Sequence, residues 1–193
     1  MSEDKKLKEE FCVFFDVLGT KSEFLTSNFE EEEKLVKKYE NFIKDIKEIL
    51  RDNGFEEDKI KLFSDNIFIN FPNTTLKEIY NVFRCLAYIQ IMAIEKYKFL
   101  LRGGVEYSTI YNEKDIVIGK GLVEAVKLEE EANYPIIILG EKVQKEFLRI
   151  LKEEKEEVLK QYKNFIHTII RIDDKMYINY LLLYYEENQE KSL

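Results

Sequence analysis

The segment on which the expected fold depends reads Ile60-Lys61-Leu62-Phe63-Ser64-Asp65-Asn66-Ile67-Phe68-Ile69. It contains two β-rich runs separated by Ser64-Asp65-Asn66, and short polar residues of this kind form turns between paired strands. The segment therefore predicts a β-hairpin with strands at 59–63 and 67–71 and with Asp65 at its tip.

Helical patterns lie on both sides of this hairpin. Apolar residues recur at helical spacing from 30 to about 51, and Thr75 begins a capping-box pattern that opens a mostly apolar helix to about 97. Shorter patterns predict strands at 11–15, 100–110, 116–118, 135–139, 168–172 and 176–182, and helices at 119–132 and 141–162. A hairpin between helices predicts an α+β fold, a ferredoxin-like sandwich with helices over a mainly antiparallel sheet. We expect one domain at 1–185 and an acidic C-terminal tail at 186–193.

Composition and charge limit the classes of function. The 193 residues are 45% hydrophobic and 35% charged, which suits a soluble domain with a sizeable core. A net charge of −8 argues against a broad surface for nucleic acid or for an anionic membrane. The polar start MSEDKKLKEE lacks the apolar stretch of a signal peptide, and no apolar run has transmembrane length, so a cytoplasmic protein is expected.

Several kinds of chemistry lack the residues that they require. Cys12 and Cys85 lie in apolar runs without metal-ligand spacing and are expected to be reduced core residues. His167 is the only histidine, so zinc sites and histidine-centred triads have no basis. The sequence also has no glycine-rich dinucleotide fingerprint and no phosphate-binding loop ending in Gly-Lys-Ser or Gly-Lys-Thr. Catalysis would therefore depend on carboxylates, lysines and a few arginines.

Two carboxylates stand at positions where they could act together. Asp16 ends the first predicted strand, and Asp65 lies at the tip of the hairpin. In a ferredoxin-like sheet the first strand and this hairpin are neighbours, so both carboxylates would reach one edge. Paired carboxylates can hold two hard cations against a triphosphate. Ordinary turn chemistry at Asp65, and the start of a loop before Gly19, are the alternative explanations.

Arg102 and Lys127 could each have a functional role or a purely structural one. Arg102 precedes Gly103 and Gly104 within a predicted strand, where glycines mark a bulge or the close approach of a ligand or another backbone. An arginine there could reach a phosphate or could form a structural salt bridge. Lys127 lies on the predicted helix at 119–132, and taken alone it is typical of a solvated lysine.

Four motifs follow one another along the chain: Phe14-Phe15-Asp16-Val17-Leu18-Gly19-Thr20, Lys59-Ile60-Lys61-Leu62-Phe63-Ser64-Asp65, Leu101-Arg102-Gly103-Gly104-Val105 and Gly119-Lys120-Gly121-Leu122-Val123-Glu124-Ala125-Val126-Lys127-Leu128-Glu129. In this order and spacing they resemble the class III nucleotidyl cyclase domain. With Ala132-Asn133-Tyr134-Pro135 behind them, they are most similar to the bacterial branch that includes the pyrimidine cyclases of Pycsar antiphage systems. The resemblance covers about 11–140. It implies the same ferredoxin-like α+β sandwich that the hydrophobic periodicity predicts.

The resemblance implies an enzyme that converts a nucleoside triphosphate to a 3′,5′-cyclic monophosphate and pyrophosphate, as a second messenger in antiphage defence with a separate effector. Asp16 and Asp65 would bind two Mg²⁺ or Mn²⁺ ions, with the backbone carbonyl of Val17 as a further ligand. The ions would activate the ribose 3′-hydroxyl and stabilise the leaving pyrophosphate. The resemblance also implies a homodimer with composite sites, each of which combines residues of both subunits.

The remaining roles are likewise implied by the resemblance. Thr20 and Lys21 match the turn whose backbone amides hold the triphosphate, and Arg102 matches a strand arginine near the phosphates. Lys59 matches a base-recognition residue, and Lys127 matches the arginine that stabilises the transition state.

The sequence departs from the family pattern at several positions. Lys127 keeps the charge of the expected arginine but loses its bidentate fork. Val123 stands where a ribose-orienting asparagine is expected, and Ser108 stands where a strand glycine is usual. The adenine-reading aspartate is matched only by Asp115 with a one-residue slip. That missing aspartate and the Pycsar resemblance favour UTP or CTP over ATP and GTP.

Two other functions remain open. The loss of the asparagine at Val123 favours a catalytically silent cyclase-like domain that binds a nucleotide or a partner protein. A palm-type cyclic dinucleotide synthase is the other alternative, although such enzymes carry a Gly-Gly-Asp-Glu-Phe-like hairpin where this chain has Phe63-Ser64-Asp65-Asn66.

Overall fold

The computed structural model describes residues 7–72, 75–153, 155 and 168–190. Its described strands form one eight-stranded sheet in the order β2-β3-β1-β4-β6-β8-β7, with β5 paired to β4. The strands are β1 (Lys8–Val17), β2 (Ile60–Phe63), β3 (Asn66–Phe71), β4 (Leu101–Glu113), β5 (Ile116–Ile118), β6 (Ile137–Leu139), β7 (Ile169–Ile172) and β8 (Lys175–Ile178). The helices are α1 (Thr20–Thr26), α2 (Phe29–Asp52), α3 (Leu76–Met92), α4 (Lys120–Glu131), α5 (Glu141–Glu153) and α7 (Tyr180–Glu190), with a 3-10 turn η1 (Glu57–Lys59) and a π-helical turn η2 (Ala93–Tyr97).

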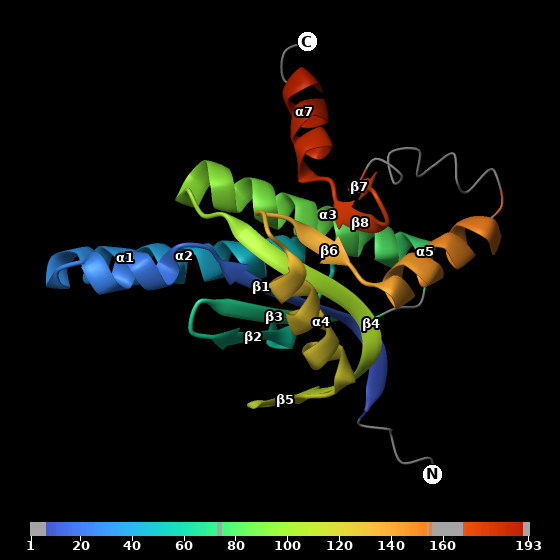
Figure 1. Ribbon diagram of the computed structural model, residues 1–193, viewed down its shortest axis with the longest axis horizontal. Helices are drawn as coiled ribbons and strands as arrows, with labels where there is room; N and C mark the ends of the chain where they lie inside the picture. The colour runs from blue at the N-terminus through green and yellow to red at the C-terminus, as the bar shows by residue number, and fades with distance from the viewer. Residues whose placement is uncertain (1–6, 73–74, 154, 156–167, 191–193) are drawn as a thin grey trace.

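The strand pairing confirms the predicted α+β sandwich. Among the described strands only β4 and β6 pair in parallel, and the other pairs are antiparallel. The β2–β3 hairpin is inserted between helices in the sequence and pairs with β1 through β3 (Figure 1). The first strand and the hairpin are therefore neighbours in the sheet, as the topology predicts.

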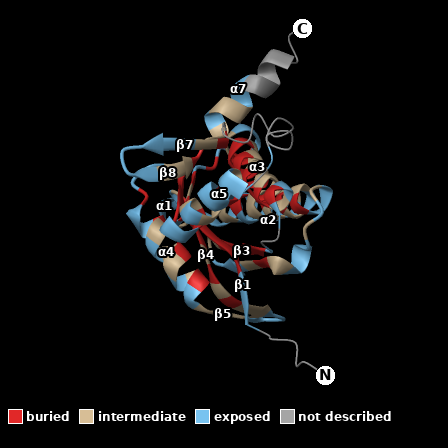
Figure 2. Cartoon of the chain, turned by 90° about the vertical axis from the view of Figure 1, so that its right-hand side faces the viewer, coloured by how far each residue is buried: buried red, intermediate tan, exposed pale blue. Residues whose placement is uncertain are grey.

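Successive side chains of β1 point to opposite faces of the sheet, and both faces are covered. Phe11, Val13 and Phe15 belong to the main core, together with buried residues of α2, α3 and α5. Cys12 and Phe14 belong to a smaller cluster under α4, which crosses the sheet in Figure 1. Figure 2 shows buried positions along both the central strands and α3. Burial on both faces explains why the first strand is a continuous apolar run and does not alternate.

One helix approaches the sheet closely enough to require a glycine. A Cβ atom at Gly104 would lie 2.3 Å from the Cβ of Leu128 and 2.6 Å from the carbonyl oxygen of Ala125, both on α4. The pairing of β1 with β4 is continuous through this position. Of the two explanations for a strand glycine, close approach by another backbone therefore applies to Gly104, and a bulge does not.

The first strand and the residues after it differ from the prediction. β1 begins at Lys8, because β4 is long enough to pair with its polar start, and Asp16 lies inside the strand opposite Asn66 and not at its end. A short helix, α1, then begins directly after Gly19, whose φ of 90° turns the chain.

The predicted strand at 176–182 is wrong beyond Ile178. The side-chain oxygen of Asn179 accepts a hydrogen bond from the backbone N–H of Leu182 at 3.3 Å, and this begins α7. Helical spacing then places Tyr180 and Leu183 against the main core, where α7 contacts α3. The stretch expected as an acidic tail is helical as far as Glu190.

The structure also bears on the predicted helix from 141, on the two cysteines and on membrane-spanning segments. The helix expected from 141 is α5, which ends at Glu153, while 156–162 and His167 lie outside the described residues. Cys12 and Cys85 are free and buried as predicted, and burial raises the pKa of Cys85 to about 12. In the part of the chain that the structure describes, no helix has the length and hydropathy needed to cross a membrane.

Candidate active site

Asp16 and Asp65 line one pocket of about 490 Å³ where β1 ends beside the turn between β2 and β3. Asp16 extends from β1, and Asp65 lies in the turn between β2 and β3. The backbone N–H of Val17 donates to the Asp65 carbonyl at 3.4 Å, which ties this turn to the first strand. The structure thus brings together two carboxylates that are 49 positions apart in the sequence.

The start of α1 forms another wall of the same pocket. Thr20 and Lys21 line it, and as the first residues of the helix their backbone amides have no acceptor within it. The hydroxyl of Thr20 donates to the Val17 carbonyl at 2.7 Å and also hydrogen-bonds the hydroxyl of Tyr39 on α2. These contacts hold α1 against the end of β1.

Arg102 lies between two carboxylates. Its Nη2 is 2.5 Å from Oε1 of Glu129 on α4 and 3.7 Å from Oδ2 of Asp16. The Glu129 side chain is only 7% exposed, so the guanidinium compensates a buried charge. The structural salt bridge considered for Arg102 is therefore present, and its contact with a phosphate stays a prediction.

The environment of these carboxyl groups disfavours their charged forms. Burial raises the pKa of Asp16, the nearby carboxylate of Asp65 raises it further, and Arg102 lowers it. Burial likewise raises the pKa of Glu129, and Arg102 again opposes the change. A bound cation would favour the charged form of Asp16, because it offsets both the lost hydration and the neighbouring negative charge.

The oxygen donors of this pocket fit a hard divalent cation. Mg²⁺ is typically held by one or two carboxylates together with water and substrate phosphates. Asp16 and Asp65 supply the carboxylates, and the Val17 carbonyl has a second lone pair besides the one that Thr20 uses. The described residues contain no cluster of three or more His, Cys, Asp or Glu arranged around one point. Water and phosphate oxygens would therefore complete the coordination of Mg²⁺ or Mn²⁺.

Lys59 and Lys127 do not line this pocket. Lys59 directly precedes β2, at the opposite end of that strand from Asp65, and its ammonium lies 3.6 Å from a carboxylate oxygen of Glu56. Lys127 is exposed on α4, one turn after Val123, which is 55% exposed. Within one chain, the predicted site residues therefore form one group around the two aspartates and leave these two lysines outside it.

Two residues of the site were not singled out by sequence reasoning. Glu129 ends the fourth motif but had no role, because nothing local indicates that it would be buried against Arg102. Tyr39 follows the apolar spacing of α2, and that spacing indicates a helix face but not the hydrogen-bond partner of any one residue. The signal that could have found either one is the pairing of distant elements, which a single sequence does not contain.

No protein-family profile and no curated protein matches the chain. Solved structures do match it. The adenylyl cyclase CyaB from P. aeruginosa has a TM-score of 0.58 and 14% identity, over 89% of this chain and 93% of that one. The guanylyl cyclase domain of the RhoGC fusion protein from the aquatic fungus Blastocladiella emersonii has a TM-score of 0.61 and 13% identity, over 89% and 94%.

A third similar structure is a class III adenylyl cyclase-like ATP-binding protein from Pseudomonas aeruginosa. Its TM-score is 0.60 at 11% identity, over 73% of this chain and 35% of that one. At these identities the likeness concerns the fold. The chain has the fold of class III adenylyl and guanylyl cyclase domains.

Proposed function

We propose that this protein is a metal-dependent nucleotidyl cyclase that converts a nucleoside triphosphate to a 3′,5′-cyclic monophosphate and pyrophosphate. The observation that carries the proposal is the convergence of Asp16, Val17 and Asp65 on one pocket, in a chain with the fold of class III cyclase domains.

Each residue of the pocket has a role in this proposal. Asp16, Asp65 and the Val17 carbonyl would hold two Mg²⁺ or Mn²⁺ ions, which when bound lower the pKa of the ribose 3′-hydroxyl and neutralise the pyrophosphate that leaves. The amides of Thr20 and Lys21, and the Lys21 ammonium, would bind the triphosphate. In-line attack of the 3′-oxygen on the α-phosphorus needs only this positioning and charge stabilisation, so no histidine is required.

The proposal includes a homodimer with composite sites. Lys59 and Lys127, the residues proposed to contact the base and the transition state, lie outside the aspartate pocket of their own chain, so the partner subunit would supply them. Exposed apolar side chains support an interface, because Val123, one turn before Lys127 on α4, and Ile116 and Ile118 on the preceding β5 are all more than half exposed. Two-fold symmetry would repeat every such contact and form two sites.

UTP or CTP is the proposed substrate, and the cyclic product would act in antiphage signalling on a separate effector. Support for the base comes from the Pycsar resemblance and from Asp115, which matches the adenine-reading aspartate only with a one-residue slip. An adenine-reading pair is therefore incomplete in this chain. The cytoplasmic location that the sequence predicts is part of the same proposal.

Two observations favour a second function, a nucleotide-binding domain without turnover. Arg102 is held by both Asp16 and Glu129, and Val123 cannot orient a ribose by hydrogen bonding. A protein of similar fold is described as a cyclase-like ATP-binding protein, so the fold alone does not distinguish binding from catalysis.

A product screen tests both functions. The protein is incubated with each of ATP, GTP, CTP and UTP in the presence of Mn²⁺, and the products are identified by mass. We expect cyclic UMP or cyclic CMP together with pyrophosphate. Cyclic AMP as the main product would contradict the proposed base. Binding of a nucleotide, measured in parallel by calorimetry, without any cyclic product would support the silent domain.

A further inference from the structure

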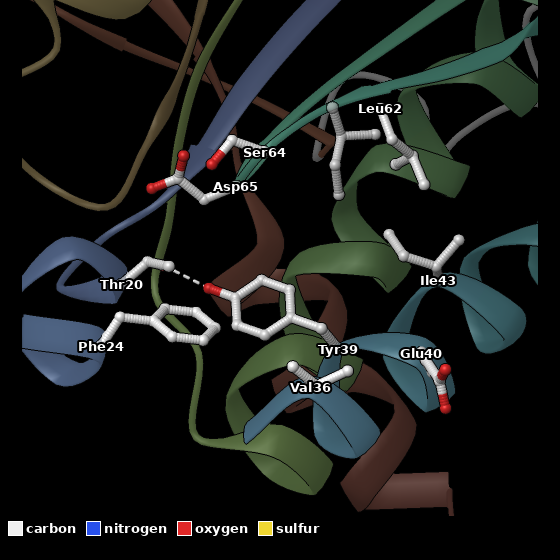
Figure 3. Close-up of a pocket in the computed structure, with 10 residues that line it drawn as sticks. Thr20, Phe24, Val36, Tyr39, Glu40, Ile43, Leu62, Ser64 and Asp65 are labelled. Carbon is white, nitrogen blue, oxygen red and sulfur yellow. Dashed lines mark hydrogen bonds between the residues drawn. The ribbon is translucent and has the colours of Figure 1, made fainter. Parts of the chain in front are cut away.

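A second pocket lies beside the candidate active site. It has a volume of about 520 Å³ between α1, α2 and the β2–β3 hairpin, within the range of small-molecule sites, about 300–1,000 Å³. Figure 3 shows apolar side chains around most of it, with Thr20 and Asp65 together on one side and Ile43 and Leu62 on the other. Its apolar lining consists of Phe24, Val36, Tyr39, Ile43, Leu62 and Ile67.

The apolar wall of this pocket is incompletely covered by the protein itself. Val36 on α2 and Leu62 on β2 are each 48% exposed although both line the pocket. The rings of Phe24 and Tyr39 lie at a centroid distance of 6.4 Å, tilted by 38°. Two neighbouring aromatic faces favour a flat ring, which gains both buried area and offset stacking.

The charges around the pocket are acidic. Asp65 is half-buried, while Glu40 is exposed and its carboxylate lies 3.1 Å from the Lys37 ammonium. Among the described residues that line the pocket, none is basic. An anion, including a nucleotide, would therefore be repelled, whereas a cation would be attracted to Asp65 because Glu40 already has a partner.

The pocket is physically connected to the candidate active site. Thr20 and Asp65 line both cavities. The hydroxyl of Tyr39 faces into this pocket and hydrogen-bonds Thr20, which in turn donates to the Val17 carbonyl. A molecule that contacts Tyr39 would thus be two hydrogen bonds away from a backbone oxygen of the other site.

We propose that this pocket binds a compact aromatic molecule that carries one positive charge, beside the nucleotide site with which it shares Thr20 and Asp65. The ring would lie against Phe24, Tyr39 and Leu62, and the ammonium group would pair with Asp65. The shared residues would couple its occupancy to the neighbouring pocket. The proposal does not depend on cyclase activity.

The test uses three probes of one shape and different charge: 1-naphthylmethylamine, 1-naphthalenemethanol and 1-naphthoic acid. Binding to the full chain is followed by ¹H–¹⁵N NMR titration without metal or nucleotide. We expect the amine to bind with a Kd of about 0.1–1 mM, as its small size allows. A charge-assisted hydrogen bond to Asp65 should make it about tenfold tighter than the alcohol, and the acid should not bind. Chemical shifts should change in α1, α2 and the β2–β3 turn.

Variants on adjacent positions of one exposed strand provide a matched control. Leu62→Lys places a cation at the mouth of the pocket and should weaken binding of the amine about tenfold or more. Phe63→Lys makes the same change at an exposed neighbour that does not line the pocket, and should leave the affinity unchanged. Equal affinity for the three probes, equal effects of the two variants, or no binding of the amine at millimolar concentration would each overturn the proposal.

Discussion

Nη2 of Arg102 lies 3.7 Å from Oδ2 of Asp16, and the two residues are direct partners in the antiparallel pairing of β4 with β1. Directly opposite residues project from the same face of a sheet, so their side chains meet without any loop. The same guanidinium also pairs with Glu129 at 2.5 Å. If a metal ion took the place of Arg102 beside Asp16, Glu129 would still balance the charge of the arginine. The N–H groups that Asp16 no longer uses could then donate to a phosphate.

Replacing either aspartate should abolish turnover while the fold is retained. Asp16→Asn or Asp65→Asn removes one of two carboxylates from the pocket, and loss of this charge stabilisation should lower kcat by about 10³-fold or more. The fold should persist, because the pKa of Asp16 is raised by burial and a neutral amide avoids that cost. Turnover, Mn²⁺ affinity and thermal unfolding check this. Asp58→Asn, on an exposed residue, is the control, and full activity of either pocket variant would refute the two-carboxylate site.

The effects of replacing Arg102 and Glu129 on the free energy of unfolding should not be additive, because each side chain compensates the charge of the other. Arg102→Met leaves the buried carboxylate of Glu129 without compensation and should lower the free energy of unfolding by about 1–3 kcal/mol, less than for a fully buried pair because Arg102 is 30% exposed. Adding Glu129→Leu should recover much of this loss. Urea unfolding of the two single variants and the double variant measures the coupling. Additive losses would mean that the pair does not act as a unit.

Gly104 should not tolerate even one added methyl group. In Gly104→Ala, the new Cβ would overlap Leu128 and the backbone of Ala125, so α4 must move away from β4. We expect a loss of about 1–3 kcal/mol in the free energy of unfolding, measured by urea denaturation. Glu113→Ala, on an exposed residue of the same strand, is the comparison. Equal stability of the two variants would show that α4 adapts freely.

Composite sites predict complementation between two inactive proteins. Asp65→Asn removes a proposed metal ligand, and Lys127→Ala removes the proposed transition-state residue from a different surface of the chain. In a mixed dimer one of the two sites would contain both intact residues, so each mixed dimer should have about half of the activity of the unsubstituted dimer. Random exchange in an equimolar mixture makes about half of the dimers mixed, so the mixture should reach about one quarter. Subunit exchange is verified separately with labelled chains. Zero activity after proven exchange would mean that each chain forms its own site.

Much of the fold follows from local patterns. The polar turn at Ser64-Asp65-Asn66 and the β-rich runs beside it predicted the hairpin, and the helical spacing after 30 and Thr75 predicted α2 and α3. Together these features define the order of elements, and the topology of a ferredoxin-like sheet then places Asp16 beside Asp65. The proximity of Asp16 and Asp65 could therefore be predicted from the sequence, because the kinds of elements and their order along the chain limit the possible strand orders.

The predicted strand at 176–182 was wrong because the local pattern there fits two kinds of element. The run Met176 to Leu182 is apolar at nearly every position, and such a run fits a buried strand as well as a helix packed on one side. The cap at Asn179 and the surface of α3 select the helix. α1 was likewise missed, because seven residues carry too little periodicity to indicate a helix without the neighbours that hold it.

The contacts between distant elements came from the tertiary structure. Periodicity indicates that Glu129 and Tyr39 belong to helices, but it does not say that one is buried against Arg102 or that the other hydrogen-bonds Thr20. Those pairings depend on the close approach of α4 at Gly104 and on the position of α1 against α2. Local propensity acts over a few residues, whereas these contacts are selected by the packing of the whole sheet, so they appear only once the chain has folded.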